Sequence, residues 1–369
     1  MQRYLRKIYY FFRPYIPIRY RWKIQEIFAN RKNGMHTEPM WPIPENPMFD
    51  PDFNQYLQEN GSLPFVLTHD VDTQHGFDNI LAVAEVEQQL GLRSSWNIVP
   101  NLYKINYKTI DALKEMGMEI GVHDWNHDGK LFSNRKVFLE RTVFVNDIIS
   151  SWRVKGFRAG MAFHNDSWMQ DIACQYDSSY YDTDPYQPLG GGCSYLTPFS
   201  LGRIIEIPYT MPQDHVLFVA KAKVRIPLAE KPISSCKENV LSWMRDYLNS
   251  NNLLSEKTRG SYIVLRGVDI WKMKMTWLVE NKGIIVMITH PDYLCNDMLK
   301  TTCSDGFFDD EEENIQYVRK KNICKPEWRN SLLEQYAAFL KWAATNFPNR
   351  MVNCLPEELS AKFIAHTTT

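Results

Sequence analysis

Short runs of apolar residues alternate along this chain with longer segments in which apolar residues recur every three or four positions. The short runs are typical of buried strands and predict strands at Pro64–Thr68, Ser94–Val99, Glu119–Val122, Gly156–Arg158, Ile204–Pro208, Tyr262–Leu265 and Ile284–Thr289. The longer segments have the period of amphipathic helices and predict helices at Asp78–Leu90, Thr109–Glu115, Lys136–Ser151, Ser235–Leu248 and Glu327–Thr345. Repeated strand-then-helix units favour a mainly parallel sheet or barrel.

Three segments interrupt this alternation. A Pro-rich connector from Met40 to Pro51 is expected to be extended. Residues 187–202 are rich in Gly, Ser and Pro, and residues 292–325 form a long polar stretch with the acidic run Asp309–Glu313. Loops of this length are typically lids or binding loops, and otherwise disordered. We therefore expect an N-terminal arm and connector over residues 1–61, and one barrel domain over residues 62–369 that carries these two insertions.

Length and composition are compatible with one large barrel, since such folds commonly reach 369 residues and 44% of this chain is hydrophobic. The seven cysteines are odd in number and form no Cys-x-x-Cys pair, which indicates reduced thiols in a cytosolic protein. No apolar stretch approaches the roughly 18 residues that span a bilayer. Arg13, Pro14 and Pro17 also break up the apolar core that a signal peptide would need. We expect a cytoplasmic protein.

The charges are distributed unevenly between the arm and the body. Residues 1–32 contain nine Lys or Arg residues and one acid, Glu26, interleaved with aromatic side chains. The rest of the chain keeps 33 cations and 42 acids, a net charge of -9, which argues against a nucleic-acid enzyme. A basic, aromatic helical arm is typical of peripheral membrane contact. The alternative is an arm that packs across the body or onto a partner chain.

Acidic residues follow the first predicted strand. Phe65–Thr68 leads into His69, Asp70, Val71 and Asp72, so two carboxylates stand at the carboxyl end of a buried strand. α/β barrels place their active sites at this end. The alternative is that these aspartates only form a turn.

A histidine pair follows the strand at Glu119–Val122. His123 and His127 are four residues apart, and Asp72 can complete a set of two imidazoles and one carboxylate that leaves positions open for water and substrate. A divalent metal held there would polarise a carbonyl and lower the pKa of water. A zincin protease would have His-Glu-x-x-His on a helix, whereas His123 is followed by Asp124 and leaves a strand. An HD-type phosphohydrolase would be all-helical.

Catalytic residue types also follow other predicted strands. Arg158 stands in Gly156–Gly160, Glu206 precedes Pro208, and His290 follows Met287–Thr289. A single Arg or His at such a point is usually structural, but several strand ends of this kind predict a shared site.

Taken in order, these segments resemble the polysaccharide deacetylases, the NodB-homology or carbohydrate esterase 4 family, over roughly residues 62–294. The resemblance implies a distorted (β/α) barrel and a metal-dependent hydrolase. By analogy with the family's first motif, Asp70 is the catalytic base and Asp72 a metal ligand. Val71 separates the two carboxylates, so these two roles are open to exchange.

The resemblance assigns roles to the remaining motifs. His123 and His127 match the metal-binding pair, with Asp124 in place of the usual Ser or Thr. Arg158 matches the residue that orients the base, and Gly160 replaces the Pro usually found two positions later.

His290 matches the general acid that protonates the leaving amine, and Thr289 replaces an apolar residue. Candidates for the fourth motif, on a groove wall, are Asp177, Tyr180 and Asp182. The segment Pro208–His215 either contacts substrate or is an ordinary loop.

The resemblance further implies one divalent metal, zinc in the first instance, with cobalt, nickel or iron as alternatives. We expect the substrate to be a carbohydrate from which an N-acetyl group is removed, namely a bacterial capsule or O-antigen precursor at the inner membrane face. The alternatives are an O-deacetylase or other amide hydrolase on the same site, and a non-catalytic saccharide-binding member of a glycan-assembly complex.

Overall fold

The computed structural model describes residues 41–187, 192–227, 235–251, 253, 258–259, 262–296 and 331–367, and four isolated positions between residues 16 and 27. The basic arm at residues 1–32 lies outside the described residues apart from those four positions. The acidic run Asp309–Glu313 and most of the insertion at residues 292–325 also lie outside them. Among the described residues, no helix is long and apolar enough to span a bilayer.

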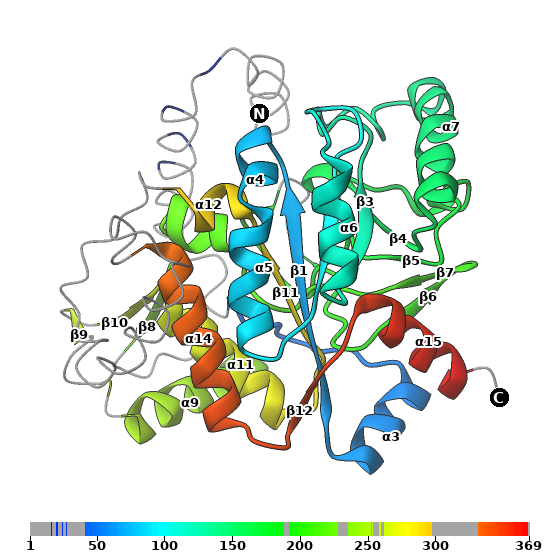
Figure 1. The fold of residues 1–369 in the computed structure, drawn as a ribbon. Coiled ribbons are helices and arrows are strands. Elements are labelled where there is room, and N and C mark those ends of the chain that lie inside the picture. The colour runs from blue at the N-terminus through cyan, green and yellow to red at the C-terminus, as the bar shows by residue number, and fades with distance from the viewer. Residues whose placement is uncertain are drawn as a thin grey trace.

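One curled, mostly parallel sheet forms the centre of the fold (Figure 1). Eight of its strands follow one path: β11 (Ile285–Thr289), β1 (Leu63–Val71), β2 (Ser94–Ile98), β3 (Glu119–His123), β4 (Gly156–Arg158), β5 (Tyr176–Asp177), β7 (Ile204–Glu206) and β6 (Phe199–Leu201). Strand β12 (Met351–Asn353) also pairs with β1. Only β6 pairs antiparallel among the described strands of this sheet. The fold is therefore α/β, a distorted (β/α) barrel, as the sequence predicts.

Helices cover the outer face of this sheet. Helices α5 (Ile80–Gln89) and α6 (Tyr107–Glu115) stand on either side of β1 in the view of Figure 1, and α7 (Arg135–Trp152) lies beyond β3 and β4. Helix α14 (Leu332–Asn346) begins later than predicted, because Ser331 and Glu334 form a capping box that fixes its first turn. Helix α9 (Ser235–Ser250) also agrees with the predicted periodicity.

One predicted strand belongs to a different sheet. β10 (Tyr262–Arg266) pairs antiparallel with β8 (Lys223–Pro227) and β9 (Thr258–Arg259). It was expected within the parallel series, and that expectation is wrong. A run of five residues carries no information about which strand becomes its neighbour, so only the tertiary structure assigns it to a sheet.

The sequence pattern also missed several elements. Helix α11 (Val268–Glu280) is buried on most sides, including Trp271 and Lys274, and so lacks an amphipathic period. Strands β5, β6 and β12 have only two or three residues each, too few for a periodic signal.

The described part of the N-terminal segment packs onto the barrel. Residues 41–46 form turns and bends, and helix α3 (Pro51–Asn60) follows, with Asp50 capping its first turn. The extended connector expected at Met40–Pro51 is therefore wrong for its first half. Trp41 and Phe53 are buried in the main core.

The arrangement brings the polar strand ends together. All nine residues of β1 are buried, because its outer face lies under helices and its inner face lies in the barrel. Parallel neighbours end at one edge of the sheet, so the carboxyl ends of β11, β1, β2, β3 and β4 surround one point. The candidate site lies at this edge.

Candidate functional site

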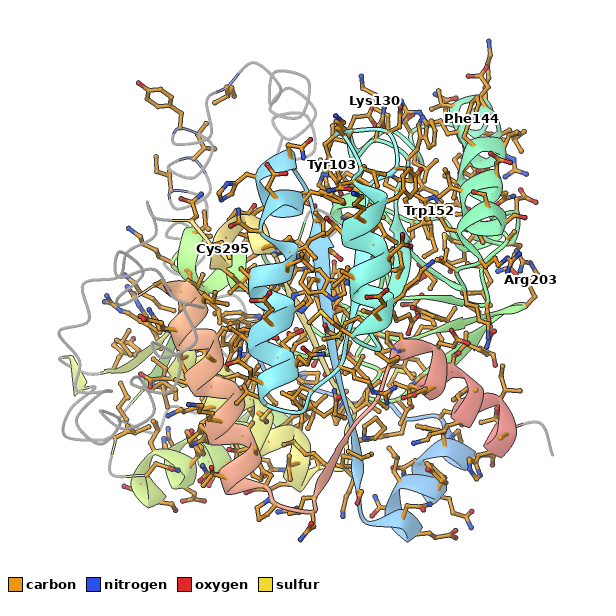
Figure 2. The ribbon with its side chains drawn as sticks, viewed as in Figure 1. Tyr103, Lys130, Phe144, Trp152, Arg203 and Cys295 are labelled. Carbon is orange, nitrogen blue, oxygen red and sulfur yellow. The ribbon has the colours of Figure 1, made fainter. Side chains whose placement is uncertain are left out.

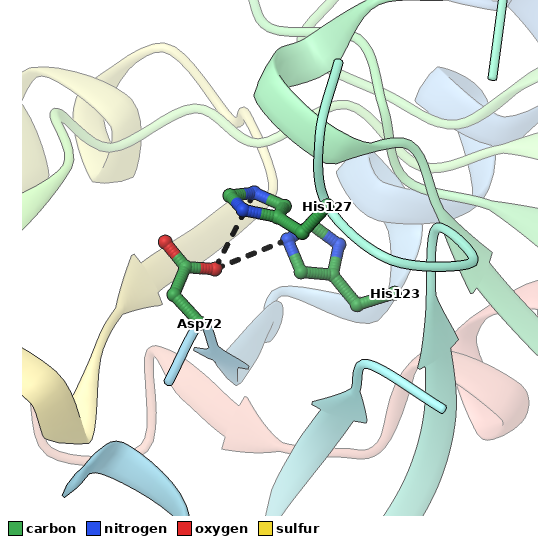
Figure 3. Close-up of side chains that lie close together, drawn as sticks. All are labelled: Asp72, His123 and His127. Carbon is green, nitrogen blue, oxygen red and sulfur yellow. Dashed lines mark ion pairs between the residues drawn. The ribbon is translucent and has the colours of Figure 1, made fainter. Parts of the chain in front are cut away.

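Three side chains from two strand ends meet in one cluster. Asp72 follows β1, His123 ends β3, and His127 lies in the loop after β3. The Oδ1 atom of Asp72 is 3.4 Å from Nε2 of His123 and 3.5 Å from Nε2 of His127 (Figure 3). The sequence-predicted ligand set therefore converges, although its members are up to 55 residues apart by their numbers in the chain.

These atoms fit a divalent metal. Bonds of roughly 2.0–2.1 Å in a tetrahedral site place two ligand atoms roughly 3.3–3.4 Å apart, close to the separations of Asp72 from both rings. Oδ1 of Asp72 is buried and has no hydrogen-bond partner among the described residues. A buried carboxylate oxygen without a donor is strongly disfavoured unless a cation satisfies it. The donor set therefore matches a site for Zn²⁺ or a similar ion.

The backbone orients His123 for this role. The Nδ1 atom of His123 lies 3.0 Å from the carbonyl oxygen of Arg158, so a proton on Nδ1 donates to that oxygen. Nε2 then carries the lone pair that faces Asp72. Metal-binding histidines are usually fixed by such a second hydrogen bond.

Strand alternation explains the spacing of the first motif. Side chains two apart on a strand share a face, so Asp70 and Asp72 point to the same side. Val71 points the other way and is completely buried in the core. Tyr103, labelled in Figure 2, fixes this strand end because it donates a hydrogen bond of 2.7 Å to the carbonyl oxygen of Val71 and accepts one of 3.0 Å from the N–H of Val99.

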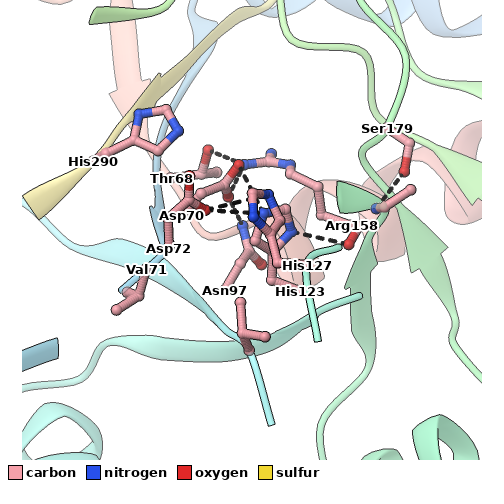
Figure 4. Close-up of polar contacts among 12 residues, drawn as sticks. Thr68, Asp70, Val71, Asp72, Asn97, His123, His127, Arg158, Ser179 and His290 are labelled. Carbon is pink, nitrogen blue, oxygen red and sulfur yellow. Dashed lines mark hydrogen bonds and ion pairs between the residues drawn. The ribbon is translucent and has the colours of Figure 1, made fainter. Parts of the chain in front are cut away.

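Asp70 is held differently from Asp72. Its Oδ1 accepts hydrogen bonds of 2.8 Å from Arg158 and 2.9 Å from Asn97 (Figure 4). Its Oδ2 lies 3.8 Å from Nε2 of His123 and so faces the metal-ligand cluster. Burial raises the pKa of Asp70, but the cations at Arg158, His123 and His290 outweigh it and lower the pKa to about 2. Asp70 is therefore ionised at neutral pH.

Gly160 is required by the packing around the ligands. A Cβ atom at this position would overlap Oδ2 of Asp124 and lie 2.9 Å from Cδ2 of His127. The loop itself is braced by Asp124, whose Oδ1 accepts a 2.6 Å hydrogen bond from the backbone N–H of Trp125. The departure from Pro to Gly thus leaves room for a ligand side chain.

His290 is paired with a residue that the sequence did not single out. Oδ1 of Asp214 lies 2.6 Å from Nδ1 of His290, and Oδ2 accepts a 2.8 Å bond from the His290 backbone N–H. Burial lowers the pKa of His290, but Asp214 outweighs it and raises the pKa to about 10. Asp214 lies in the polar segment Pro208–His215, and its place after a predicted strand was the only signal available.

Asp214, His215 and His290 also form a second cluster of metal-ligand type. However, Oδ1 of Asp214 already accepts from the His215 backbone N–H at 2.7 Å as well as facing His290, and Oδ2 accepts the His290 backbone N–H. A carboxylate with donors on both oxygens needs no cation. We therefore interpret this cluster as an acid–histidine pair.

The three candidates for the fourth motif lie elsewhere. Asp177 is completely buried at the end of β5. Tyr180 donates a 2.6 Å hydrogen bond to Asp166. Asp182 forms a buried ion pair with Lys274. Among the contacts that the structure describes, none of the three reaches the cluster of Asp72 and the two histidines.

The presence of Thr289 in place of an apolar residue also has a structural reason. Its Oγ1 lies 2.8 Å from Nδ1 of His69, whose Nε2 lies 2.8 Å from Glu87. Both His69 and Glu87 are completely buried. The hydroxyl therefore takes part in a buried polar network that an apolar residue could not complete.

Comparisons with known proteins give a similarity of fold. No protein-family model and no curated protein matches the chain. Among solved structures, the chain is similar to the carbohydrate esterase family 4 domain of a multidomain xylanase from the hindgut metagenome of Trinervitermes trinervoides (12% identity, TM-score 0.36, 82% of this chain and 91% of that chain). It is also similar to a polysaccharide deacetylase described as involved in O-antigen biosynthesis in Bordetella bronchiseptica (12%, 0.36, 75% and 90%) and to an allantoinase (10%, 0.44, 83% and 91%).

Two of these structures thus come from the family that the strand-end motifs resemble. Identities and TM-scores this low carry no functional argument. The function is therefore argued from the site.

Proposed function

We propose that this protein is a metal-dependent hydrolase that removes an N-acetyl group from a sugar of a bacterial surface-glycan precursor, such as a capsule or O-antigen intermediate. The observation that carries the proposal is the convergence of Asp72, His123 and His127 around the unsatisfied Oδ1 of Asp72. Two imidazoles and one carboxylate are typical of catalytic rather than structural zinc sites, because such a set leaves positions open.

Zinc is the metal that this donor set favours in the first instance, and cobalt, nickel or iron are alternatives. A bound ion would supply Lewis-acid polarisation of the acetamide carbonyl and would make a nearby water more acidic. Asp72, His123 and His127 would hold it. The hydrogen bond from Nδ1 of His123 to the Arg158 carbonyl keeps Nε2 turned toward the ion.

Asp70 is suited to act as the base. Arg158 and Asn97 occupy its Oδ1, so Oδ2 remains on the side of the cluster to accept a proton from the attacking water. The geometry favours this assignment over the exchanged one, because Asp72 faces both rings whereas Asp70 approaches only His123. Arg158 itself acts by holding Asp70 in place.

His290 is suited to act as the acid. Because Asp214 binds its Nδ1 and raises its pKa to about 10, the imidazole is protonated at neutral pH. Its Nε2–H remains to donate to the departing amine. A base and an acid whose pKa values are shifted far apart are typical of a site that both removes a proton from the attacking water and donates one to the leaving group.

Assays on the purified protein test this proposal. Acetate release would be measured on a panel of N-acetylated and O-acetylated oligosaccharides, and bound metal by elemental analysis. His123→Ala and His127→Ala should lose metal and activity together, whereas His366→Ala, on α15 (Pro356–Thr367), should keep both. Full activity of either ligand variant in metal-free buffer would refute the mechanism.

The same panel separates the alternatives. Release from O-acetylated substrates alone would indicate an O-deacetylase. Absence of both bound metal and turnover would indicate a non-catalytic saccharide-binding protein.

We also propose that the protein acts in the cytoplasm, at the inner membrane face, through the basic arm at residues 1–32. The support is the sequence of the arm, which lies outside the described residues apart from isolated positions. Cell fractionation of the full chain and of a chain lacking residues 1–32 tests this. An unchanged, wholly unbound distribution of both would contradict it.

A further inference from the structure

Two carboxyl groups lie side by side next to the strand that carries Arg158. Asp177 ends β5 and Glu206 ends β7, and the two residues are direct partners in this parallel pair. Register partners on parallel strands point to the same face of the sheet. Both side chains are completely buried. None of the steps proposed above uses either of them.

Each carboxyl group has one satisfied oxygen and one unsatisfied oxygen. Oδ1 of Asp177 accepts a 2.7 Å hydrogen bond from the hydroxyl of Ser179, and Oε1 of Glu206 accepts a 3.0 Å bond from the backbone N–H of Tyr180. Oδ2 of Asp177 and Oε2 of Glu206 are buried without a partner that can donate among the described residues. The two carboxyl groups are close enough for Asp177 to raise the pKa of Glu206.

The surrounding charges do not neutralise two carboxylates. Burial raises the pKa of Asp177, and the side chains of His164, from the loop after β4, and Arg158, from β4, lower it. The guanidinium of Arg158, however, is already bound to Asp70. Within the part of the chain that the structure describes, the other titratable groups on which the pair acts are the thiols of Cys174 and Cys193 and the phenol of Tyr180.

Burial and mutual repulsion act in the same direction on the pair. Burial raises the pKa of Asp177, and burial together with the neighbouring Asp177 raises the pKa of Glu206. Two adjacent carboxyl groups in a buried site cannot both ionise and share a proton instead.

The pair is linked to the proposed catalytic base by a short chain of contacts. The carbonyl oxygen and hydroxyl of Ser178 accept hydrogen bonds of 2.7 and 2.8 Å from Arg158. The hydroxyl of Ser179 accepts a 2.8 Å bond from the N–H of Ala159 (Figure 4). The same hydroxyl donates to Asp177. The acid pair thus binds Ser179 and Tyr180, and the adjoining residue Ser178 holds Arg158.

We propose that Asp177 and Glu206 share one proton between Oδ2 and Oε2, and that this acid pair is a positioning unit that holds Arg158, and through it Asp70, in register. The part that concerns Asp70 as a base rests on the proposed function. The shared proton does not.

Infrared spectroscopy tests the shared proton without any substrate. At about pH 9, ordinary carboxyl groups are ionised, and so are the buried acids Asp182, Glu119 and Asp292, whose pKa values are raised to about 6, about 7 and about 7. Wild type should keep the band of a protonated carboxyl group at this pH. The band should disappear in both Asp177→Asn and Glu206→Gln. Its absence from wild type, or its persistence in both variants, would overturn the shared proton.

Steady-state kinetics test the positioning role. Glu206→Gln keeps an N–H donor toward Asp177 and should retain kcat within about twofold, whereas Glu206→Leu should lower kcat by about tenfold or more with KM and bound metal unchanged. The matched control is Glu119, a buried acid at the amino end of β3. Glu119→Leu should lower thermal stability but not kcat. Equal kcat losses in the two Leu variants would refute positioning.

The two experiments separate the possible failures. Suppose that the wild-type protein releases no acetate from any substrate, while the infrared band is present in wild type and absent from both amide variants. This result would contradict the proposed function and not the shared proton. If Glu206→Leu does not fold, Asp177→Leu takes its place and should lower kcat by about tenfold or more, whereas Asp177→Asn, whose amide still supplies a donor to Glu206, should keep kcat within about twofold. Equal kcat in these two variants would count against the positioning role.

Discussion

Replacing Gly160 by Ala is the most direct probe of the candidate metal site. A Cβ atom added to this glycine would point toward Asp124 and toward His127 in the loop after β3. An added Cβ would overlap Oδ2 of Asp124 and approach Cδ2 of His127 to 2.9 Å. Both contacts are shorter than real Cβ contacts, so the buried carboxyl group of Asp124 and the imidazole of His127 must both move.

The size of the displacement follows from contact distances. Carbon atoms in ordinary contact are about 3.5–4.0 Å apart, so the ring of His127 must shift by about 0.6 Å or more. Functional constellations tolerate displacements of about 0.5 Å, and disturbing the supports of a metal ligand typically costs about 10–100-fold in affinity. Overpacking itself costs about 1–3 kcal/mol. We therefore expect Gly160→Ala to bind metal about 10–100-fold more weakly.

Competition with a chelator measures this affinity, and thermal unfolding without metal measures stability separately. Gly91→Ala is the control, because its Cβ meets nothing within 4 Å while its φ of +71° still makes alanine strained. That control should lose stability, by about 1 kcal/mol, and keep its metal affinity. A Gly160→Ala protein whose affinity stays within twofold of wild type would refute the steric argument.

Three further predictions concern the acid–base groups. Asp70→Asn should retain metal and lose about 10²–10⁴-fold in kcat, because the amide cannot accept the proton; kcat and bound metal are measured together. Asp214→Asn removes the carboxylate that raises the pKa of His290, so the alkaline limb of the kcat–pH profile should move to lower pH. Burial raises the pKa of Glu119 from 4.5 to about 7, even though hydrogen bonds from Tyr176 and the Glu357 backbone lower it. Its folded pKa lies above its unfolded value, so its contribution is complete below about pH 4.5 and is lost as pH rises through about 7. Relative to Glu119→Gln, wild type should lose about 3 kcal/mol of unfolding free energy between those limits, measured by denaturant titration.

Each of these has a contrary outcome. Loss of metal from the Asp70→Asn protein would exchange the roles of Asp70 and Asp72. An unmoved alkaline limb after Asp214→Asn would mean that His290 does not provide the titrating acid. A difference between wild type and Glu119→Gln that is independent of pH would show that Glu119 ionises normally in the fold.

Local pattern in the sequence was sufficient for the frame of the site. Strand alternation places Asp70 and Asp72 on one face, and the carboxyl ends of parallel strands meet at one edge. The motif residues at the ends of β1, β3, β4 and β11 are therefore brought together in the structure largely as their order predicts. Short-range periodicity is enough to predict these positions, because the end of each apolar run marks the end of a strand without reference to the rest of the fold.

The partners of these residues depended on which segments became neighbours in space. Asp214 reaches His290 across 76 positions of the chain, and Asp177 meets Glu206 only because β7 lies beside β5. The need for glycine at position 160 arises from a side chain in another loop. A hydrophobic pattern reports whether a residue is buried but not what it is buried against, so sequence determined the strand ends and their chemistry. Tertiary packing alone decided which residues pair to orient them, because the partners are far apart in the sequence and become neighbours only when the sheet is assembled.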